Sequence, residues 1–421
     1  NGSHLNELSP VLGKKLPYVG QYILETRLDL RPDGIKTRLL TVRTPVSYLQ
    51  GKLFYHYGKP VVLNMRFNDS HLTMSDLRFS PRTTSKPEKT AMKSKKPAGQ
   101  KKDKPMVVPE MDLMALLSPS IKFNLDIKSS NISFEKLTVT DLDLKLRWED
   151  KIFASEITSG TLSGGDLTSD IYLTVVDKEA AGKMEMDIKQ LDYGQLMQSV
   201  SFGDKMKGRA DVNIHLVGFG RSLREYLTHS DGTAEFVGEK GILASRYLKL
   251  WGEDIVQQIL PFNWFGSEQT GLNCVVGRFD LTNGRLSSDS LLIDTEGMTI
   301  AGTGAVDLNT EQLAFELMPD PKNVSLLSLA TPVKIRGTMA RPKIEPHTLG
   351  TTWTIGSLLA GLANPSILIA RFAKLGSLGE NPCLAAIGKK EGEEEETSFR
   401  KMFKDAVQFF QRPLDRMPDL E

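Results

Sequence analysis

Two stretches near the middle of the chain alternate between apolar and polar side chains, and they decide the fold class. They are Met184-Glu185-Met186-Asp187-Ile188-Lys189 and Asp211-Val212-Asn213-Ile214-His215-Leu216. Alternate side chains of a β-strand point to opposite faces of a sheet, so this pattern predicts strands with one apolar and one wet face. The same period recurs in residues 63–67, 121–127, 142–148, 171–175 and 333–335. The short spacings between these runs predict a mainly β protein built from antiparallel meanders.

The composition suits a folded protein without a dominant charge. The chain has 421 residues, of which 40% are hydrophobic, enough for two or more domains or for one elongated sheet. Lysine and arginine nearly balance aspartate and glutamate, and the formal net charge is +1. No global field therefore attracts nucleic acid, and we expect no nucleic-acid partner.

We expect four segments along the chain. Residues 1–80 form an N-terminal strand block, residues 110–345 form the main β region with short helices, and residues 346–421 form a helical end. Residues 1–4 are typical of a cloning vector, so the chain is expected to be excised from a longer protein. Residues 81–109 are rich in Lys and Pro and predict a disordered linker. Its lysines either are solvated or contact anionic lipid headgroups.

Helical spacing is confined to a few segments. We expect helices at residues 192–200, 222–229, 244–260, 352–375 and 398–411. Residues 348–370 carry no charge and approach the roughly 20 residues that span a bilayer. Three interpretations stay open: this segment covers the end of the sheet, contacts a membrane or spans one. Pro365 in its middle argues against a membrane span. Its candidate membrane or cap contacts are Trp353, Leu358, Leu359, Leu362, Ile367 and Ile369.

The sequence carries no catalytic motif. Its six histidines are scattered, and His-Glu-x-x-His, Gly-x-Ser-x-Gly and Gly-x-x-x-x-Gly-Lys are all absent. We therefore expect no enzymatic activity, no cofactor and no metal site. Gly218-Phe219-Gly220 and Gly302-Thr303-Gly304 superficially resemble nucleotide loops, but neither has a third Gly opening a helix. We interpret both as turn glycines.

The apolar sides of the predicted strands are the candidate binding surface. If they share one face and no helix covers it, the face would bind acyl chains, each buried methylene contributing about 0.8 kcal/mol. If a second layer covers it, the same side chains form an ordinary sandwich core. The candidate lipid-binding residues are Phe123, Leu125, Leu144, Leu173, Val175, Met186, Ile188, Val212 and Ile214.

Several motifs, taken in order, resemble the AsmA family. Residues 207–227 combine a Gly-led strand, the turn Gly218-Phe219-Gly220-Arg221-Ser222 and a short helix. Residues 231–236 and 241–243 continue the pattern, and residues 284–286, 300–308 and 313–317 are similar to strand pairs of its C-terminal region. Asn381-Pro382-Cys383 is similar to a short element of the same family, and the resemblance runs from the first strands to about Gly388.

This resemblance implies an elongated, curved, mostly antiparallel sheet with an apolar groove, capped by C-terminal helices. It implies an inner-membrane-anchored periplasmic protein, here without its N-terminal anchor, similar in build to bridge-like lipid transfer proteins. The implied function is to bind phospholipid and convey it between the inner and outer membranes of a Gram-negative envelope, supporting outer-membrane homeostasis. The alternative is a non-transporting structural protein that assists outer-membrane protein assembly, and either function allows further envelope partners.

The chain has two cysteines, Cys274 in a predicted strand and Cys383 after the apolar helices. In the oxidising periplasm that the resemblance implies, they form either a disulfide joining the helical end to the sheet or two buried thiols.

Overall fold

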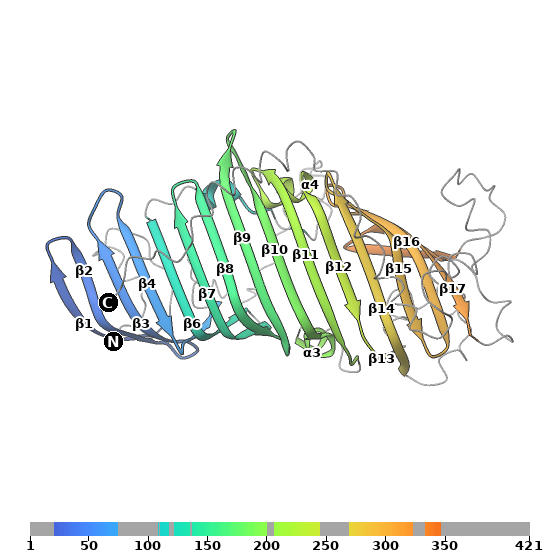
Figure 1. Cartoon of the computed structure of the whole chain (residues 1–421), viewed down its shortest axis with the longest axis horizontal. Helices are drawn as coiled ribbons and strands as arrows, with labels where there is room; N and C mark the ends of the chain where they lie inside the picture. The colour runs from blue at the N-terminus through green and yellow to red at the C-terminus, as the bar shows by residue number, and fades with distance from the viewer. Residues whose placement is uncertain are drawn as a thin grey trace, which may run out of the picture.

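One large sheet dominates the protein. The computed structural model describes residues 21–74, 108, 110–117, 122–134, 137–199, 206–244, 269–322 and 333–346. These residues form a single sheet of 19 strands with three short helices. The sheet is long, twisted and curved, with its strands side by side along the length of the molecule (Figure 1). The predicted mainly β fold with an elongated, mostly antiparallel sheet is confirmed.

The strands follow in chain order, and most are long. Their bounds are β1 Ile23–Arg31, β2 Gly34–Arg43, β3 Tyr48–His56, β4 Val62–Asn68, β5 His71–Thr73, β6 Lys122–Phe134, β7 Leu137–Glu149, β8 Ile152–Leu162, β9 Gly165–Val176, β10 Glu179–Asp192, β11 Arg209–Gly220, β12 Asp231–Gly238, β13 Gly241–Ala244, β14 Gln269–Thr282, β15 Arg285–Thr295, β16 Met298–Asp307, β17 Gln312–Pro321, β18 Val333–Thr338 and β19 Arg341–Pro346.

The topology is a meander with one parallel junction. β1 to β4 pair antiparallel in sequence, and the same holds from β6 onward. Between these blocks, β4 and β5 both pair parallel with β6, so the chain must cross the sheet between residues 74 and 122. β5 continues the line of β4, and β13 continues that of β12 along β14. At about 4.8 Å per strand, the sheet extends roughly 80 Å.

The three helices lie at the ends of strands. They are α2 Leu113–Leu116, α3 Tyr193–Ser199 and α4 Leu223–Thr228. α3 and α4 confirm the helices predicted at residues 192–200 and 222–229. Ser222 caps α4 because its side chain accepts a hydrogen bond from Glu225 N. The remaining predicted helices, including the C-terminal helical cap, and residues 81–107 of the predicted linker lie outside the described residues.

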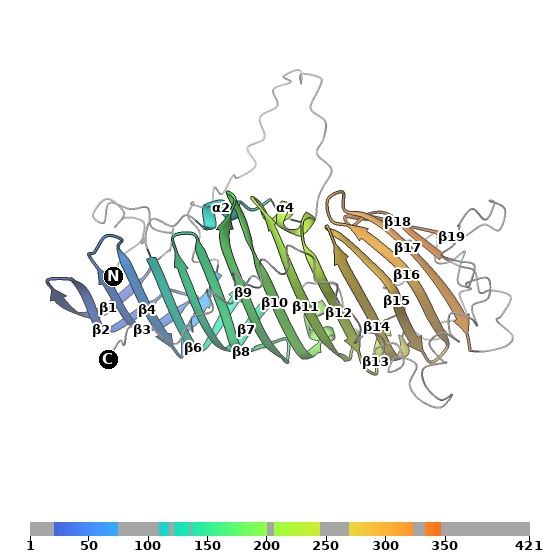
Figure 2. The same cartoon turned by 45° about the horizontal axis from the view of Figure 1, so that its top comes forward.

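We call the row of strand ends that carries α2 and α4 the α4 rim; α3 lies at the opposite row of ends (Figures 1 and 2). Tyr226 anchors α4 over the sheet: its side chain is 1% exposed, and its hydroxyl donates a hydrogen bond to Gly182 O at 3.0 Å. Beneath it, Cβ atoms at Gly218 and Gly220 would lie 2.2 Å from Ser230 Oγ and 2.4 Å from Tyr226 N. Glycine therefore allows the helix to lie against the strand.

The interpretation of two Gly-x-Gly motifs as turns was wrong. Gly218 and Gly220 lie within β11, and Gly302 and Gly304 lie within β16. A Cβ at Gly304 would lie 2.0 Å from the Phe315 ring of the next strand. A Cβ at Gly302 would lie 2.5 Å from the Leu317 side chain, so these glycines make room for a neighbouring helix or side chain rather than for a change of chain direction.

Residues 110–117, which we call the strap, run along the α4 rim into α2. Leu113 is 2% exposed and Leu117 is fully buried, and both pack with Leu173, Ala180 and Tyr226. The strap is also held by its backbone, because Leu113 N donates to Arg221 O and Leu223 N donates to Met111 O. It thus covers the strand ends of β9 and β10.

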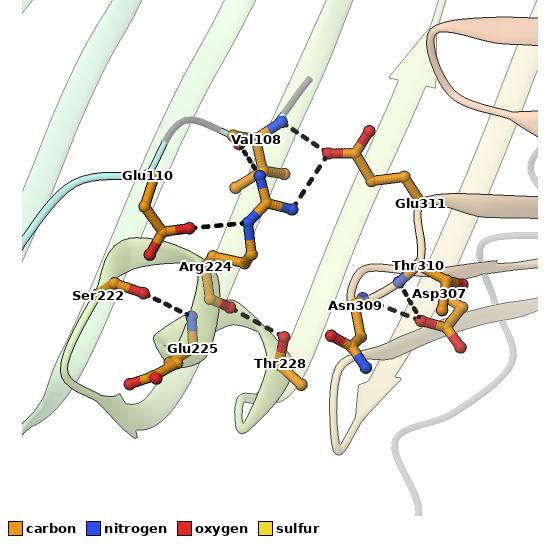
Figure 3. Close-up of polar contacts among 10 residues, drawn as sticks. All are labelled: Val108, Glu110, Ser222, Arg224, Glu225, Thr228, Asp307, Asn309, Thr310 and Glu311. Carbon is orange, nitrogen blue, oxygen red and sulfur yellow. Dashed lines mark hydrogen bonds and ion pairs between the residues drawn. The ribbon is translucent and has the colours of Figure 1, made fainter. Parts of the chain in front are cut away.

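Arg224 ties the strap to a distant hairpin (Figure 3). Its Nε lies 3.0 Å from Glu110 Oε2, its Nη2 donates to Val108 O, and its Nη1 lies 3.6 Å from Glu311 Oε1. Glu311, which is 1% exposed in the β16–β17 turn, also accepts from Val108 N at 2.9 Å. Hydrogen bonds from Ser222 and then Arg224 lower the pKa of Glu110. One guanidinium therefore joins α4, the strap and the β16–β17 turn.

Replacing Tyr226 by Phe removes the buried hydroxyl and leaves Gly182 O without this donor. We expect the Tyr226→Phe variant to lose about 1–2 kcal/mol of unfolding free energy, measured by urea denaturation. Tyr57→Phe is the matched control, because Tyr57 is 49% exposed and its change should stay within about 0.5 kcal/mol. Equal stability of the two variants would contradict the anchoring role.

Replacing Arg224 by Gln leaves the carboxylate of Glu311 buried without the guanidinium charge. We expect a loss of about 2–3 kcal/mol of unfolding free energy, and partial recovery when Glu311→Gln is added. Glu110→Gln serves as the control: Glu110 is 66% exposed, so its exposed ion pair should contribute less than about 1 kcal/mol. If Arg224→Gln and Glu110→Gln unfold at the same urea concentration, the Arg224–Glu311 pair does not hold the rim.

Candidate functional site

The strand register places apolar side chains of nearly the whole sheet on one face. Residues opposite each other on neighbouring strands point to the same face. Phe123 is opposite Trp148, Phe153 is opposite Leu173, and Met186 is opposite Ile214. We call this surface the apolar face. Its members include Leu28, Leu40, Leu53, Met65, Leu125, Leu146, Phe153, Ile171, Leu173, Met186, Ile188, Val212, Ile214, Phe236, Phe279, Leu291, Ile300, Phe315 and Ile335.

All nine candidate lipid-binding residues lie on the apolar face. They come from β6, β7, β9, β10 and β11, and the pairings bring them together: Phe123, Leu125, Leu144, Leu173, Val175, Met186, Ile188, Val212 and Ile214. Leu173 and Ile188 are buried, and the other seven are half-buried. Their binding of lipid stays a prediction.

The sequence reasoning missed how far this face continues. β1 to β4 extend it on one side with Leu28, Leu53 and Met65, and β12 to β18 extend it on the other with Phe236 and Phe315. The alternating runs at residues 63–67 and 333–335 were the available signal for these outer strands. Their pairing order, which makes the face continuous, is visible only in the structure.

β-bulges keep the apolar residues on the same face where a strand gains extra residues. In β10 the register with β11 shifts between Ile188 and Leu191, yet both side chains belong to one buried cluster with Leu167. Gln190 takes a positive φ of 58° in this bulge, and its N–H donates to Asp211 Oδ1 at 2.7 Å. Gln190 is thus the extra residue of the bulge. Because it shifts the alternation of β10 by one position, the Leu191 side chain points to the apolar face again.

The opposite face of the central strands is polar and carries ion pairs. Lys183 Nζ on β10 lies 3.3 Å from Asp170 Oδ2 on β9 and 3.3 Å from Glu185 Oε2 on its own strand. His215 Nε2 on β11 lies 3.4 Å from Glu185 Oε1. The centre of the sheet thus has one water-facing side and one apolar side, as the alternation predicts.

The apolar face is covered at the α4 rim and half-buried in its middle. α2 and the Leu227 side chain of α4 pack over the ends of the central strands. Away from this rim, Leu125, Leu146, Ile171 and Met186 keep part of their surface accessible. The arrangement can hold apolar chains against the sheet without any polar ligand group.

The other predicted site residues are described only in part. Cys274 lies in β14, is 2% exposed and is disulfide-bonded, whereas Cys383, the other cysteine of the sequence, lies outside the described residues. Trp353, Leu358, Leu359, Leu362, Ile367 and Ile369 also lie outside them. Within the described ranges, no group of three His, Cys, Asp or Glu side chains could hold a metal ion. None of the helices in the described part of the chain is long and apolar enough to cross a membrane.

Comparisons with known proteins identify the family. The AsmA family matches residues 62–291, more than half of the chain. AsmA family protein YhjG of Escherichia coli (strain K12) is 23% identical over 385 residues, which cover 87% of this chain and 55% of that relative. The chain therefore spans about half the length of the relative. No solved structure matches the chain. Since the match covers most of the strands that build the apolar face, this protein belongs to the AsmA family, which indicates an envelope-associated function.

Proposed function

We propose that the protein binds phospholipid through its apolar face and conveys it between the inner and outer membranes. The observation that carries the proposal is the continuity of that face, from Leu28 in β1 to Ile335 in β18. The protein would act in the periplasm, anchored to the inner membrane, and without a catalytic step or cofactor. Membership of an envelope-associated family supports this location.

The apolar face can supply the binding energy without a specific polar contact. Burying a methylene group contributes about 0.8 kcal/mol, so a chain of about sixteen carbons that loses half its contact with water gains roughly 6 kcal/mol. Half-buried side chains such as Leu125, Ile171 and Met186 have surface left for this contact. A charged headgroup can stay in water at a rim of the sheet and avoids the cost of burial.

The length of the apolar face favours transport of lipid along the sheet over binding of lipid at a single point. The sheet extends roughly 80 Å, compared with about 30 Å for the hydrocarbon core of a bilayer. An acyl chain that moves by one strand exchanges one set of Leu, Ile, Met and Phe contacts for a similar set. The binding free energy changes little along the path, and the barrier to each step stays low.

Bound lipid should be lost when charges interrupt the apolar face. Met186 and Ile214 are directly opposite on β10 and β11, so Met186→Lys with Ile214→Glu places a charge pair there without changing the net charge. We expect phospholipid recovered by organic extraction and mass spectrometry, and lipid transfer between vesicles, to fall about tenfold or more. The variant must first be shown to fold by its far-ultraviolet circular dichroism.

The matched control places the same two charges on the polar face. Ala305 and Ala314 are directly opposite on β16 and β17, and Ala305→Lys with Ala314→Glu should leave bound lipid and transfer unchanged. If neither variant lowers lipid content, the apolar face does not bind the lipid. If the wild-type protein carries no lipid and transfers none, the alternative of a non-transporting scaffold for outer-membrane protein assembly is favoured.

Photocrosslinking should distinguish the two faces on a single strand. A photoreactive amino acid in place of Ile171 or Ile214 would lie on the apolar face, and one in place of Tyr172 or His215 on the opposite face. We expect lipid adducts, detected by intact-mass measurement after irradiation with phospholipid vesicles, at the first two positions only. Equal labelling at all four positions would indicate adsorption to vesicles rather than binding along the face.

A further inference from the structure

The face opposite the apolar face changes its character along the sheet. Over β10 and β11 it carries the ion pairs of Lys183 and His215. From β12 to β17 it carries a line of apolar side chains, because residues that are opposite one another on successive strands are all apolar there. We call these residues the outer row: Val237, Val276, Leu292, Ala301 and Met318. Their neighbours along the strands, such as Phe236 and Ile300, lie on the apolar face, so the outer row points the other way.

The centre of the outer row is almost completely buried. Val276, Leu292 and Ala301 are 2%, 1% and 2% exposed. On the apolar face, Ile171 and Met186 also have a paired strand on each side, yet they stay half-buried. Flanking strands alone therefore do not bury a side chain to this extent, and another part of the chain must cover the outer row. The described helices pack mainly on β10 and β11, so the cover comes from elsewhere.

A disulfide identifies the part of the chain that covers the outer row. Cys274 is 2% exposed, and it precedes Val276 by two residues on the same face of β14, at a distance of about 7 Å. It is disulfide-bonded, and the other cysteine of the sequence is Cys383. The Cα atoms of bonded cysteines are usually about 6 Å apart, so the bond holds Cys383 within reach of the outer row. The next four residues, Leu384-Ala385-Ala386-Ile387, are apolar, as such a cover requires.

The charged residue beside the disulfide is already compensated. Asp294 is opposite Cys274 and is 4% exposed. Its carboxylate lies 2.9 Å from Lys322 Nζ and accepts hydrogen bonds from Thr299 Oγ1 and Asn273 Nδ2 at 2.6 and 2.8 Å. A segment that covers this part of the sheet therefore needs no basic side chain to neutralise the buried carboxylate. An apolar segment suffices.

We propose that residues 384–387 dock on the outer row, held there by the disulfide between Cys274 and Cys383, and form a local second layer on β14 to β16. The covalent bond makes docking of so short a segment favourable, because it keeps the segment at a high effective concentration beside its site. The docked segment lies on the side of the sheet opposite the proposed lipid-binding surface. Docking and lipid binding therefore do not compete, and the inference does not depend on the proposed function.

Photocrosslinking of the full, oxidised chain tests which face the segment covers. Photoreactive amino acids in place of Val237 or Met318 flank the buried part of the outer row, and those in place of Phe236 or Leu317 lie on the apolar face of the same strands. After irradiation and reduction of the disulfide, peptide mapping by mass spectrometry should find the peptide with residues 384–387 joined to the outer positions. Equal adducts at the apolar-face positions, or outer positions joined to another segment or to a second copy of the chain, would overturn the proposal.

Charges in the segment separate docking from tethering. Leu384→Asp with Ile387→Asp should lower the yield of these adducts about fivefold or more, because the aspartates would be buried against the outer row. Intact-mass measurement with and without reduction must show that the disulfide persists. Thr397→Asp with Ser398→Asp is the control, since it adds the same charge outside the apolar segment and should leave the yield unchanged. An unchanged yield in the first variant would mean that the disulfide tethers the segment without docking, contrary to the proposal.

Discussion

The two-residue period of the β-strand is the constraint on which the rest of this structure depends. Every strand must keep its apolar residues in phase with its neighbours, because a slip of one residue would turn them to the wet face. The pairs at the centre of the sheet keep this phase, because Met186 is opposite Ile214 and Phe153 is opposite Leu173. Where extra residues occur, bulges such as the one at Gln190 restore it. A long apolar face is the direct result.

The fold class and the central part of the candidate site could be predicted from the sequence, because alternation is a local property of the chain. Nine residues chosen for their period lie on one face. The bulges could not be predicted, since glutamine is not a residue type that favours a positive φ and nothing in the sequence marks Gln190 as left-handed. The sequence also could not show that Gly218 and Gly220 lie within a strand. The need for glycine there becomes visible only when α4, with Tyr226, is seen to lie against that strand. Long-range pairings, such as the parallel junction of β4 and β6, also lack a local signal.

The α4 rim shows how a sheet is fixed in shape where the described part of the chain provides no second full layer. Arg224 brings together Glu110, Val108 and Glu311, which are far apart in sequence. Glu311 is buried, and Arg224 is one of the groups that compensate its carboxylate, together with Val108 N, so the geometry of the rim is narrowly defined. The strap closes one side of the apolar face through these polar contacts and through the buried side chains of Leu113 and Leu117, and the middle of the face keeps apolar side chains that are half-buried.

Among the described residues no second layer fills the apolar face, and this has a free-energy cost that a folded protein must offset. Exposed leucines such as Leu28 and Leu30 lose the burial energy that a sandwich core would provide, and they invite association. Acyl chains lying on the face would recover part of that energy, because they would cover the side chains that a second layer would otherwise cover. The apolar face and its need for a cover thus both follow from the same alternation that defines the fold.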